Sequence, residues 1–261
     1  MSPAAHAATL TVRRSARFVA WVRSWRAGLV PYDDVAEEIV GDEEHMAADM
    51  PGTWTDVPLP QALATLSKLH PDQIRLVLPA PGDVRGLPPT GPFSGAALLA
   101  GEGVLAGDLG LVAEVRTHTS GSGDEFSTVL WRCFAVPETG PDHLTPATGE
   151  AEAELTAALA DATKALARLD VAQWRPELAG ALAALRKPDN GTDLPPGFTP
   201  RARRLFARAG VLDRVLALAA EVAPGGAVNG FEAQMREDAL RPLTVACRRA
   251  LVAACNSPLE V

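Results

Sequence analysis

The stretch that decides the fold is residues 109–135, which read LGLVAEVRTHTSGSGDEFSTVLWRCFA. On both sides of its centre the side chains alternate: Leu111, Ala113 and Val115 against Val112, Glu114 and Arg116, then Val129, Trp131 and Cys133 against Leu130, Arg132 and Phe134. A period of two residues is typical of a strand with one buried face. The link between the two halves, SGSGD at 120–124, has the composition of a flexible hairpin loop. Residues 109–135 therefore predict a pair of antiparallel strands.

Further strands are predicted upstream of this pair. Residues 74–78, IRLVL, are short and apolar, and Gly107-Asp108 lies between two apolar stretches, as in a tight hairpin. Short connections favour antiparallel neighbours, so we expect a sheet of about three or four strands. Apolar spacing and helix-stop signals predict helices packed on this sheet, whereas residues 42–57 look acidic and irregular. The helices are expected over residues 15–27, 32–40, 61–69 and 94–101.

The second half of the sequence is predicted to be all-helical. Residues 137–149 are polar and rich in Pro and Gly, as a linker is, and beyond them no strand pattern remains. Helical stripes of apolar residues and helix-start signals predict helices over 155–169 and 178–185, from Pro200 to about 222, and after Asn229, with Pro242 expected to kink or split the last one.

These patterns predict an α+β fold in two domains. Residues 1–145 would hold a small, mostly antiparallel sheet plus helices, and residues 146–261 would form an all-α helical bundle.

Composition narrows the class of protein. The net charge of −8 disfavours non-specific binding to nucleic acid or to an anionic membrane, and the apolar runs are far shorter than the about 20 residues of a membrane-spanning helix. Three cysteines do not make a disulfide framework. Cys247 and Cys255, if they share a helix, lie about 12 Å apart, whereas a disulfide needs Cα atoms within about 7 Å. We expect buried, inert thiols in a cytoplasmic protein.

Two charged segments each have rival interpretations. Residues 201–214 carry five arginines against one acid, which would suit nucleic-acid binding. We favour arginines that face acidic neighbours or solvent, because the segment lacks interleaved aromatic residues and the rest of the chain is acidic. The run Asp42-Glu43-Glu44-His45 consists of possible metal ligands, but consecutive loop residues rarely converge on one ion. We interpret it as a solvated acidic turn and expect all five histidines at surface or cap positions.

No motif for catalysis or cofactor binding is recognisable. The sequence has no G-x-S-x-G nucleophile elbow, no P-loop and no dinucleotide-binding glycine pattern. We expect no metal and no cofactor, and whether the protein is an enzyme stays open.

The best remaining candidate site is the loop at residues 79–92, PAPGDVRGLPPTGP, which follows a strand expected to be buried. Gly82 and Gly86 would allow close approach of a ligand to the backbone, and Asp83 could orient Arg85 for a bidentate contact with a carboxylate or phosphate. The competing interpretation, which we favour, is a structural crossover in which Asp83 caps a turn.

Four segments resemble a family of uncharacterised proteins from GC-rich actinobacteria: LPAPGDVRGLP at 78–88, ALLAGE at 97–102, LDVAQWRP at 169–176 and RRALVAA at 248–254. The resemblance covers most of the chain. It implies a source and a cytoplasmic location, and it carries no activity.

Three hypotheses follow for function. The first is a non-enzymatic cytosolic interaction or regulatory protein that binds a protein partner or self-associates through its helical half, with an exposed apolar patch. The second is an enzyme or binding protein that holds an anionic ligand at loop 79–92. The third, ranked last, is a nucleic-acid binder that uses residues 201–214.

Overall fold

The structure is a computed structural model that describes residues 13–121, 123–137, 145–168, 193–221 and 230–260. The chain divides into two compact units. The one we call the α+β unit contains residues 13–145 together with 194–199 and 255–261, and the one we call the helical unit draws on 146–193 and 200–254.

A six-stranded sheet forms the centre of the α+β unit, with the order β2-β1-β6-β5-β4-β3. Every neighbouring pair is antiparallel except β1 and β6, which run parallel. The predicted α+β class with a mostly antiparallel sheet is therefore confirmed. The strands are β1 (Glu44–Ala48), β2 (Val57–Pro58), β3 (Ile74–Val77), β4 (Gly103–Ala106), β5 (Leu109–Thr119) and β6 (Glu125–Ala135).

Two of these strands correct the prediction from sequence. We expected three or four strands and an irregular segment over 42–57, but β1 and β2 both lie in that segment. β1 pairs along its whole length with β6, from Glu44 opposite Thr128 to Ala48 opposite Arg132. Short strands of this kind owe their conformation to the neighbouring strand, so local composition is a weak guide to them.

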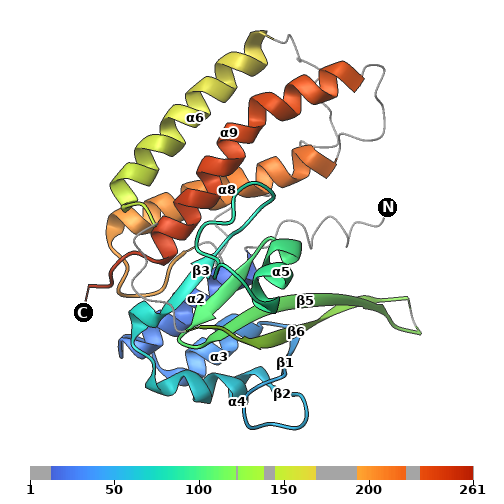
Figure 1. Cartoon of the computed structure of the whole chain (residues 1–261), viewed down its shortest axis with the longest axis vertical. Coiled ribbons are helices and arrows are strands. Elements are labelled where there is room, and N and C mark those ends of the chain that lie inside the picture. Colours follow the sequence, from blue (N-terminus) through green and yellow to red (C-terminus); the bar gives the residue numbers. More distant parts are fainter. Residues whose placement is uncertain (1–12, 122, 138–144, 169–192, 222–229, 261) are drawn as a thin grey trace. The chain divides into compact units, whose positions relative to one another are not determined.

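Helices cover both faces of the sheet (Figure 1). On one face, Phe18 packs against Trp131 with ring centroids 4.9 Å apart. On the other face, Phe93 and Ala97 form a buried cluster with Val77 and Leu105. The helices are α2 (Arg14–Arg26), α3 (Tyr32–Val40), α4 (Leu59–Leu63), the 3-10 turns η1 (Ala64–Lys68) and η2 (Pro71–Gln73), and α5 (Pro92–Ala100).

The strand register explains why the two faces differ. Leu76, Val104, Leu111 and Cys133 are opposite one another across β3, β4, β5 and β6, so they share a face. Gly110 lies on the other face, where a Cβ atom would come within 2.3 Å of the Phe93 ring. The absence of a side chain at Gly110 therefore lets α5 approach the sheet closely.

The helical unit contains α6 (Thr148–Arg168), α8 (Pro200–Glu221) and α9 (Gly230–Cys255). The all-helical prediction is confirmed for the described residues of this half; the helix expected over 178–185 lies outside them. The last helix continues through Pro242, so of the kink or split expected there the split is wrong and the kink stays a prediction. Cys247 and Cys255 both lie in α9, which meets the condition set for their separation in the sequence, and both are buried and outside any disulfide.

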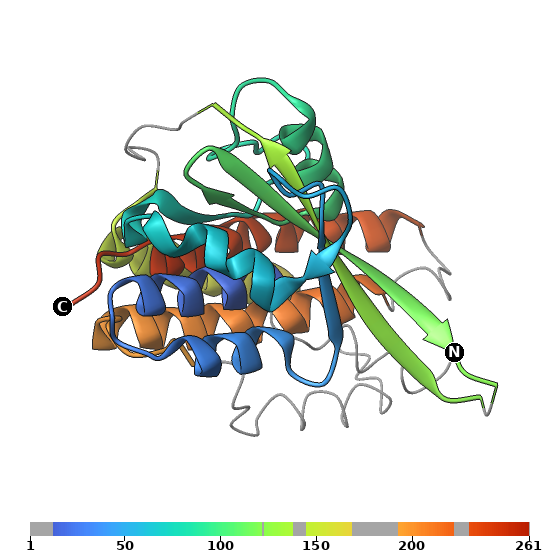
Figure 2. The ribbon, with the colours of Figure 1, turned by 90° about the horizontal axis from the view of Figure 1, so that it is seen from below.

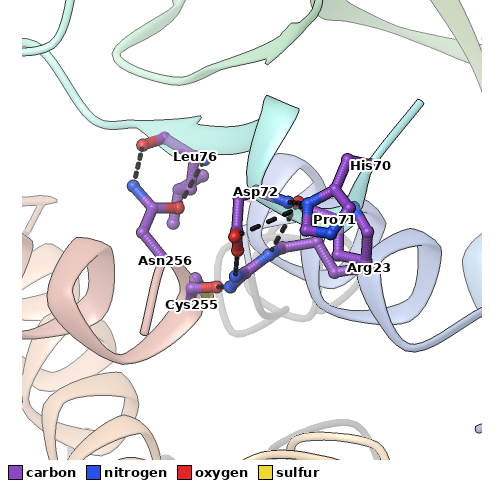
Figure 3. Close-up of polar contacts among 7 residues, drawn as sticks. All are labelled: Arg23, His70, Pro71, Asp72, Leu76, Cys255 and Asn256. Carbon is purple, nitrogen blue, oxygen red and sulfur yellow. Dashed lines mark hydrogen bonds and ion pairs between the residues drawn. The ribbon is translucent and has the colours of Figure 1, made fainter. Parts of the chain in front are cut away.

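A buried arginine anchors the segment 255–260 within the α+β unit (Figure 3). Arg23 of α2 is 1% exposed. Its Nε donates to the Pro71 carbonyl oxygen at 3.1 Å, and its terminal nitrogens reach the Cys255 carbonyl oxygen and, at 3.2 Å, the Asp72 carboxylate. Each of the three guanidinium nitrogens of Arg23 thus donates to an oxygen atom.

The side chain of Asn256, the next residue, forms hydrogen bonds with the backbone of β3, as a neighbouring strand would. Its side-chain oxygen accepts the Leu76 N–H at 2.8 Å, and its side-chain nitrogen donates to the Leu76 carbonyl at 3.0 Å (Figure 3). Because β3 is the last strand of the sheet, this amide satisfies backbone groups that would otherwise lie at an open edge. The segment is further held by a hydrogen bond from the Glu260 N–H to the Gly197 carbonyl, 2.8 Å.

Candidate functional site

The structure places the predicted loop residues Asp83 and Arg85 together. Arg85 donates from Nε to Asp83 Oδ1 at 2.7 Å and from Nη2 to Asp83 Oδ2 at 2.8 Å. The Arg85 side chain is 41% exposed and that of Asp83 18%. Asp83 does orient Arg85, as the sequence suggested, but it also occupies one edge of the guanidinium that a carboxylate or phosphate would use.

The two glycines of the same loop have local structural roles. Gly82 has φ +81° and lies in the tight turn in which Ala80 and Asp83 exchange backbone hydrogen bonds of 2.9 and 2.8 Å. Gly86 has φ +82°, and a Cβ atom there would lie 3.0 Å from Val77 Cγ1. The close approach at Gly86 is therefore to the protein's own core rather than to open space for a ligand.

Three of the five arginines of residues 201–214 contact partners within the helical unit. Arg201 Nε lies 2.8 Å from Glu152 Oε2, Arg203 lies 3.2 Å from Asp193, and Arg208 donates to the Thr156 hydroxyl. The hydrogen bond from Arg201 lowers the pKa of Glu152. These contacts are the arrangement we favoured from sequence, and they leave less uncompensated positive charge for a phosphate backbone.

His45 contradicts the prediction of a solvated acidic turn. It is 4% exposed and lies in β1, where its Nδ1 accepts a hydrogen bond from Trp131 Nε1 at 3.2 Å. An Nδ1 that accepts leaves the proton on Nε2, which faces Glu43 Oε2 at 3.3 Å. His45 and Ala47 lie on the same face of β1, opposite Val129 and Trp131 of β6. This two-residue spacing indicates a strand, but the acidic residues beside it obscured the pattern in the sequence. His70, in contrast, caps η2 as expected of a cap residue.

The chain of contacts continues from His45 to the surface. Glu43 receives a bidentate contact from Arg14, at 2.6 Å from Nη2 and 3.2 Å from Nε. Burial lowers the pKa of His45, although Glu43 opposes this, so the ring is neutral at pH 7. Burial alone would raise the pKa of Glu43, but the hydrogen bond and charge of Arg14, with His45, hold it below its ordinary value. This network is fully partnered, and we interpret it as a support for the β1–β6 pair.

The described residues contain no group of three His, Cys, Asp or Glu side chains placed to hold a metal ion. They also contain no helix with the length and apolar character needed to cross a membrane.

The β5–β6 hairpin is the feature that stands out as a surface for contact. β5 pairs with β4 only as far as Leu111, and β6 pairs with β1 only from Thr128 onward. Residues 112–127, which we call the arm, therefore extend beyond at least one of the neighbouring strands; Figure 2 shows the two-stranded ribbon leaving the sheet. Among the strands that the structure describes, none pairs with the outer edge of β5 from Val112 to Thr119.

Apolar and aromatic side chains are exposed on this arm. Val115 is 45% and Phe126 52% exposed. Phe126 lies opposite His118, whose ring stacks on it with centroids 5.1 Å apart, and His118 Nε2 is 2.8 Å from the Thr128 hydroxyl. The arm thus combines a regular backbone, an unpaired edge and large side chains in solvent, which is the combination found at edges that bind another strand.

Comparison with known proteins matches both halves of the chain to one family. The family model described as "Rv1486c-like protein, N-terminal domain" matches residues 15–147, and "Rv1486c-like protein, C-terminal domain" matches residues 149–252. No solved structure matches the chain.

Mycobacterial relatives extend over nearly the whole chain. Uncharacterized protein Rv1486c of Mycobacterium tuberculosis (strain ATCC 25618 / H37Rv) is 28% identical over 279 residues, covering 92% of this chain and 95% of that one. Uncharacterized protein ML1804 of Mycobacterium leprae (strain TN) is 27% identical, with the same coverage. Uncharacterized protein MAV321 of Mycobacterium avium is 27% identical over 72% of this chain and 71% of its own. The resemblance to uncharacterised actinobacterial proteins is confirmed, and these relatives have no assigned function.

Proposed function

We propose that this chain, which belongs to the Rv1486c-like protein family, is a non-enzymatic protein that acts through protein–protein contacts, with the β5–β6 arm as its contact surface. The observation that carries the proposal is the outer edge of β5, which no strand among the described residues pairs with beyond Leu111, together with the exposed side chains of Val115 on β5 and Phe126 on β6. An extended segment of another protein can hydrogen-bond to such an edge while apolar side chains supply burial.

The arm replaces the helical half as the surface that we favour. Of the large apolar side chains that are exposed among the described residues, Met235 alone lies in the helical unit, and it is only 38% exposed. The others are in the α+β unit: Trp54, Val84, Leu99, Val115 and Phe126. Only the last two lie on paired strands that present an open edge.

We also place the protein in the cytoplasm, on the state of its cysteines. Cys133, Cys247 and Cys255 are all free and buried. Burial raises the pKa of Cys133 and of Cys255 to about 12, so neither is a reactive thiolate. Free thiols and no disulfide suit a reducing compartment.

Photo-crosslinking in living cells tests the contact surface. A benzophenone amino acid replaces Phe126 in the full chain, and the same amino acid replaces Trp54, a fully exposed aromatic outside the arm, as the matched control. We expect protein adducts, with another chain or with a second copy, at position 126 and not at position 54. The same adduct pattern at both positions would overturn the proposal.

A second candidate is anion binding at loop 79–92. It is favoured by the bidentate hold of Asp83 on a guanidinium that stays 41% exposed. Titration with inorganic phosphate tests it. Arg85→Ala should abolish binding, whereas Asp83→Asn should strengthen it by removing the competing carboxylate. Binding that ignores both substitutions would remove this candidate.

A further inference from the structure

Resting on the proposed contact role of the arm, we infer that its partner is a second copy of this chain. In the pairing we propose, β5 of one copy lies antiparallel to β5 of the other, with Val115 opposite Val115 of the second copy. The two hairpins then form one continuous four-stranded ribbon.

The backbone of β5 is suited to this pairing. The edge from Val112 to Thr119 reads VAEVRTHT and contains no proline and no lysine. Proline, lysine, other charged side chains and bulges are the usual means by which an edge strand avoids other chains, and the charged residues of this edge are Glu114 and Arg116. The pairing of β5 with β6 is regular from Leu109 to Thr119, without a bulge, so the whole outer edge keeps strand geometry.

The charges on β5 favour a second copy over an unrelated strand. Glu114 and Arg116 flank Val115 symmetrically. Antiparallel pairing centred on Val115 therefore sets Glu114 of each copy opposite Arg116 of the other, and directly opposite residues share a face of the sheet. Two ion pairs form in this register, whereas a shift by two residues in either direction places neither Glu114 opposite Arg116 nor Val115 opposite itself.

Within one copy these charges have only loose partners. Arg116 Nη2 lies 3.9 Å from Glu114 Oε2, and Arg132 Nη1 lies 3.8 Å from Glu114 Oε1. Their side chains are 63% exposed for Arg116 and 43% for Glu114. Both groups can turn toward a neighbouring copy without losing a short hydrogen bond.

The apolar residues of the arm complete the match. Val115 lies opposite Val129 of its own β6, and with Val115 of the second copy on its other side it gains a row of branched side chains across the ribbon. Ala113 and Thr117 meet each other across the same interface, so small and β-branched groups alternate along that face.

Cysteine crosslinking tests the register in the full chain. Directly opposite residues have Cα atoms about 4.5–5.5 Å apart, within the range of a disulfide, so Val115→Cys should give a disulfide-linked dimer under mild oxidation. Thr117→Cys is the matched control on the same face: its counterpart lies four residues away along the strand, about 14 Å. The native cysteines are buried and free, so they contribute little background. Equal crosslinking of both variants, or of neither, would overturn the register.

Charge exchange tests the same pairing without a covalent bond. Glu114→Arg alone and Arg116→Glu alone each place like charges opposite one another twice, which should weaken dimerisation at least about tenfold in sedimentation equilibrium. Mixed together, the two single variants should associate again, because all arginines then face all glutamates. The double variant E114R/R116E should self-associate like the natural chain.

The outcomes separate this inference from the proposed function. A chain that stays monomeric at every concentration, with no Val115→Cys dimer, overturns pairing with a second copy. If photo-crosslinking at position 126 still yields an adduct with a different protein, the contact role of the arm survives. Phe126 lies on β6, one strand away from the edge of β5 that would pair with the second copy, so absence of any adduct at position 126 defeats both only together with absence of the Val115→Cys dimer.

Discussion

Replacing Arg23 with methionine should release the segment 255–260 from the α+β unit. Methionine keeps much of the volume and apolar stem of arginine but donates no hydrogen bond. The buried carbonyl oxygen of Cys255 would lose this donor, whereas the part-buried Pro71 carbonyl oxygen would keep the hydrogen bond from the Ile74 N–H. The Asp72 carboxylate, 69% exposed, would return to water.

The magnitude follows from the one carbonyl that would be left without a donor, that of Cys255. A buried acceptor without a donor costs about 1–3 kcal/mol. Relief from burying a charged guanidinium offsets part of that cost, because burial opposes the charged form and lowers the pKa of Arg23. We expect a net loss of about 2 kcal/mol for docking of the segment.

Hydrogen exchange at the Leu76 amide measures this docking locally. That N–H is hydrogen-bonded to the Asn256 side chain, so it exchanges when the segment detaches. A loss of about 2 kcal/mol corresponds to exchange roughly 30-fold faster. Asn256→Ala, which removes the bond itself, gives the upper limit of the effect.

Asp72→Asn is the control that separates burial from charge pairing. An exposed carboxylate contributes at most about 1 kcal/mol to such a pair, so Leu76 exchange should rise no more than about fivefold. If Asp72→Asn matched Arg23→Met, the ion pair rather than the contact with the buried Cys255 carbonyl would hold the segment. If Arg23→Met left Leu76 exchange unchanged, the anchoring role of Arg23 would be wrong.

Three further predictions concern the interior of the protein. Burial lowers the pKa of His45 below its value in the unfolded chain, so stability should be greatest above about pH 6.5 and fall as the pH drops through that value. His45→Asn, which keeps an acceptor for Trp131, should make the thermal unfolding midpoint depend less on pH between about pH 7.5 and about 5.5. An unchanged pH dependence of the midpoint would count against the buried network. A thiol reagent at about pH 8 should modify none of the three cysteines in the native chain and all three in denaturant, and rapid native labelling would contradict their burial. Gly110→Ala should cost about 1–3 kcal/mol in chemical unfolding, because its Cβ would overlap the Phe93 ring; Phe93→Leu in the same background should recover part of the loss, and no recovery would argue against that contact.

Local sequence patterns were sufficient to predict most strands of the sheet. β3 to β6 and the helices that precede and follow them were predicted, because alternation and glycine stops act within a few residues. β1 was missed because it pairs with β6, more than 70 residues away, and β2 because it pairs in turn with β1. The three acids before His45 also outweighed the short alternation that follows. The linear division into residues 1–145 and 146–261 stays a prediction.

The candidate surfaces were predicted less completely. The Asp83–Arg85 pair could be anticipated, because the two residues are neighbours in a stiff loop. The arm could not, although both of its strands were predicted, because its exposure depends on β4 and β1 ending early against β5 and β6. A sequence pattern gives the length of each strand only roughly, and it does not give the overlap between them.

The contact between Leu76 and Asn256 spans 180 residues of chain, and this has a consequence during synthesis. A ribosome that adds about 5–20 residues per second takes about 10 to 40 s to make the intervening chain. During that interval β3 emerges without the amide that covers its edge, while the residues of the helical unit are still being made. The nascent sheet is then a target for chaperones and for strands of neighbouring nascent chains, so translation speed between the two units should influence how much protein reaches the native state.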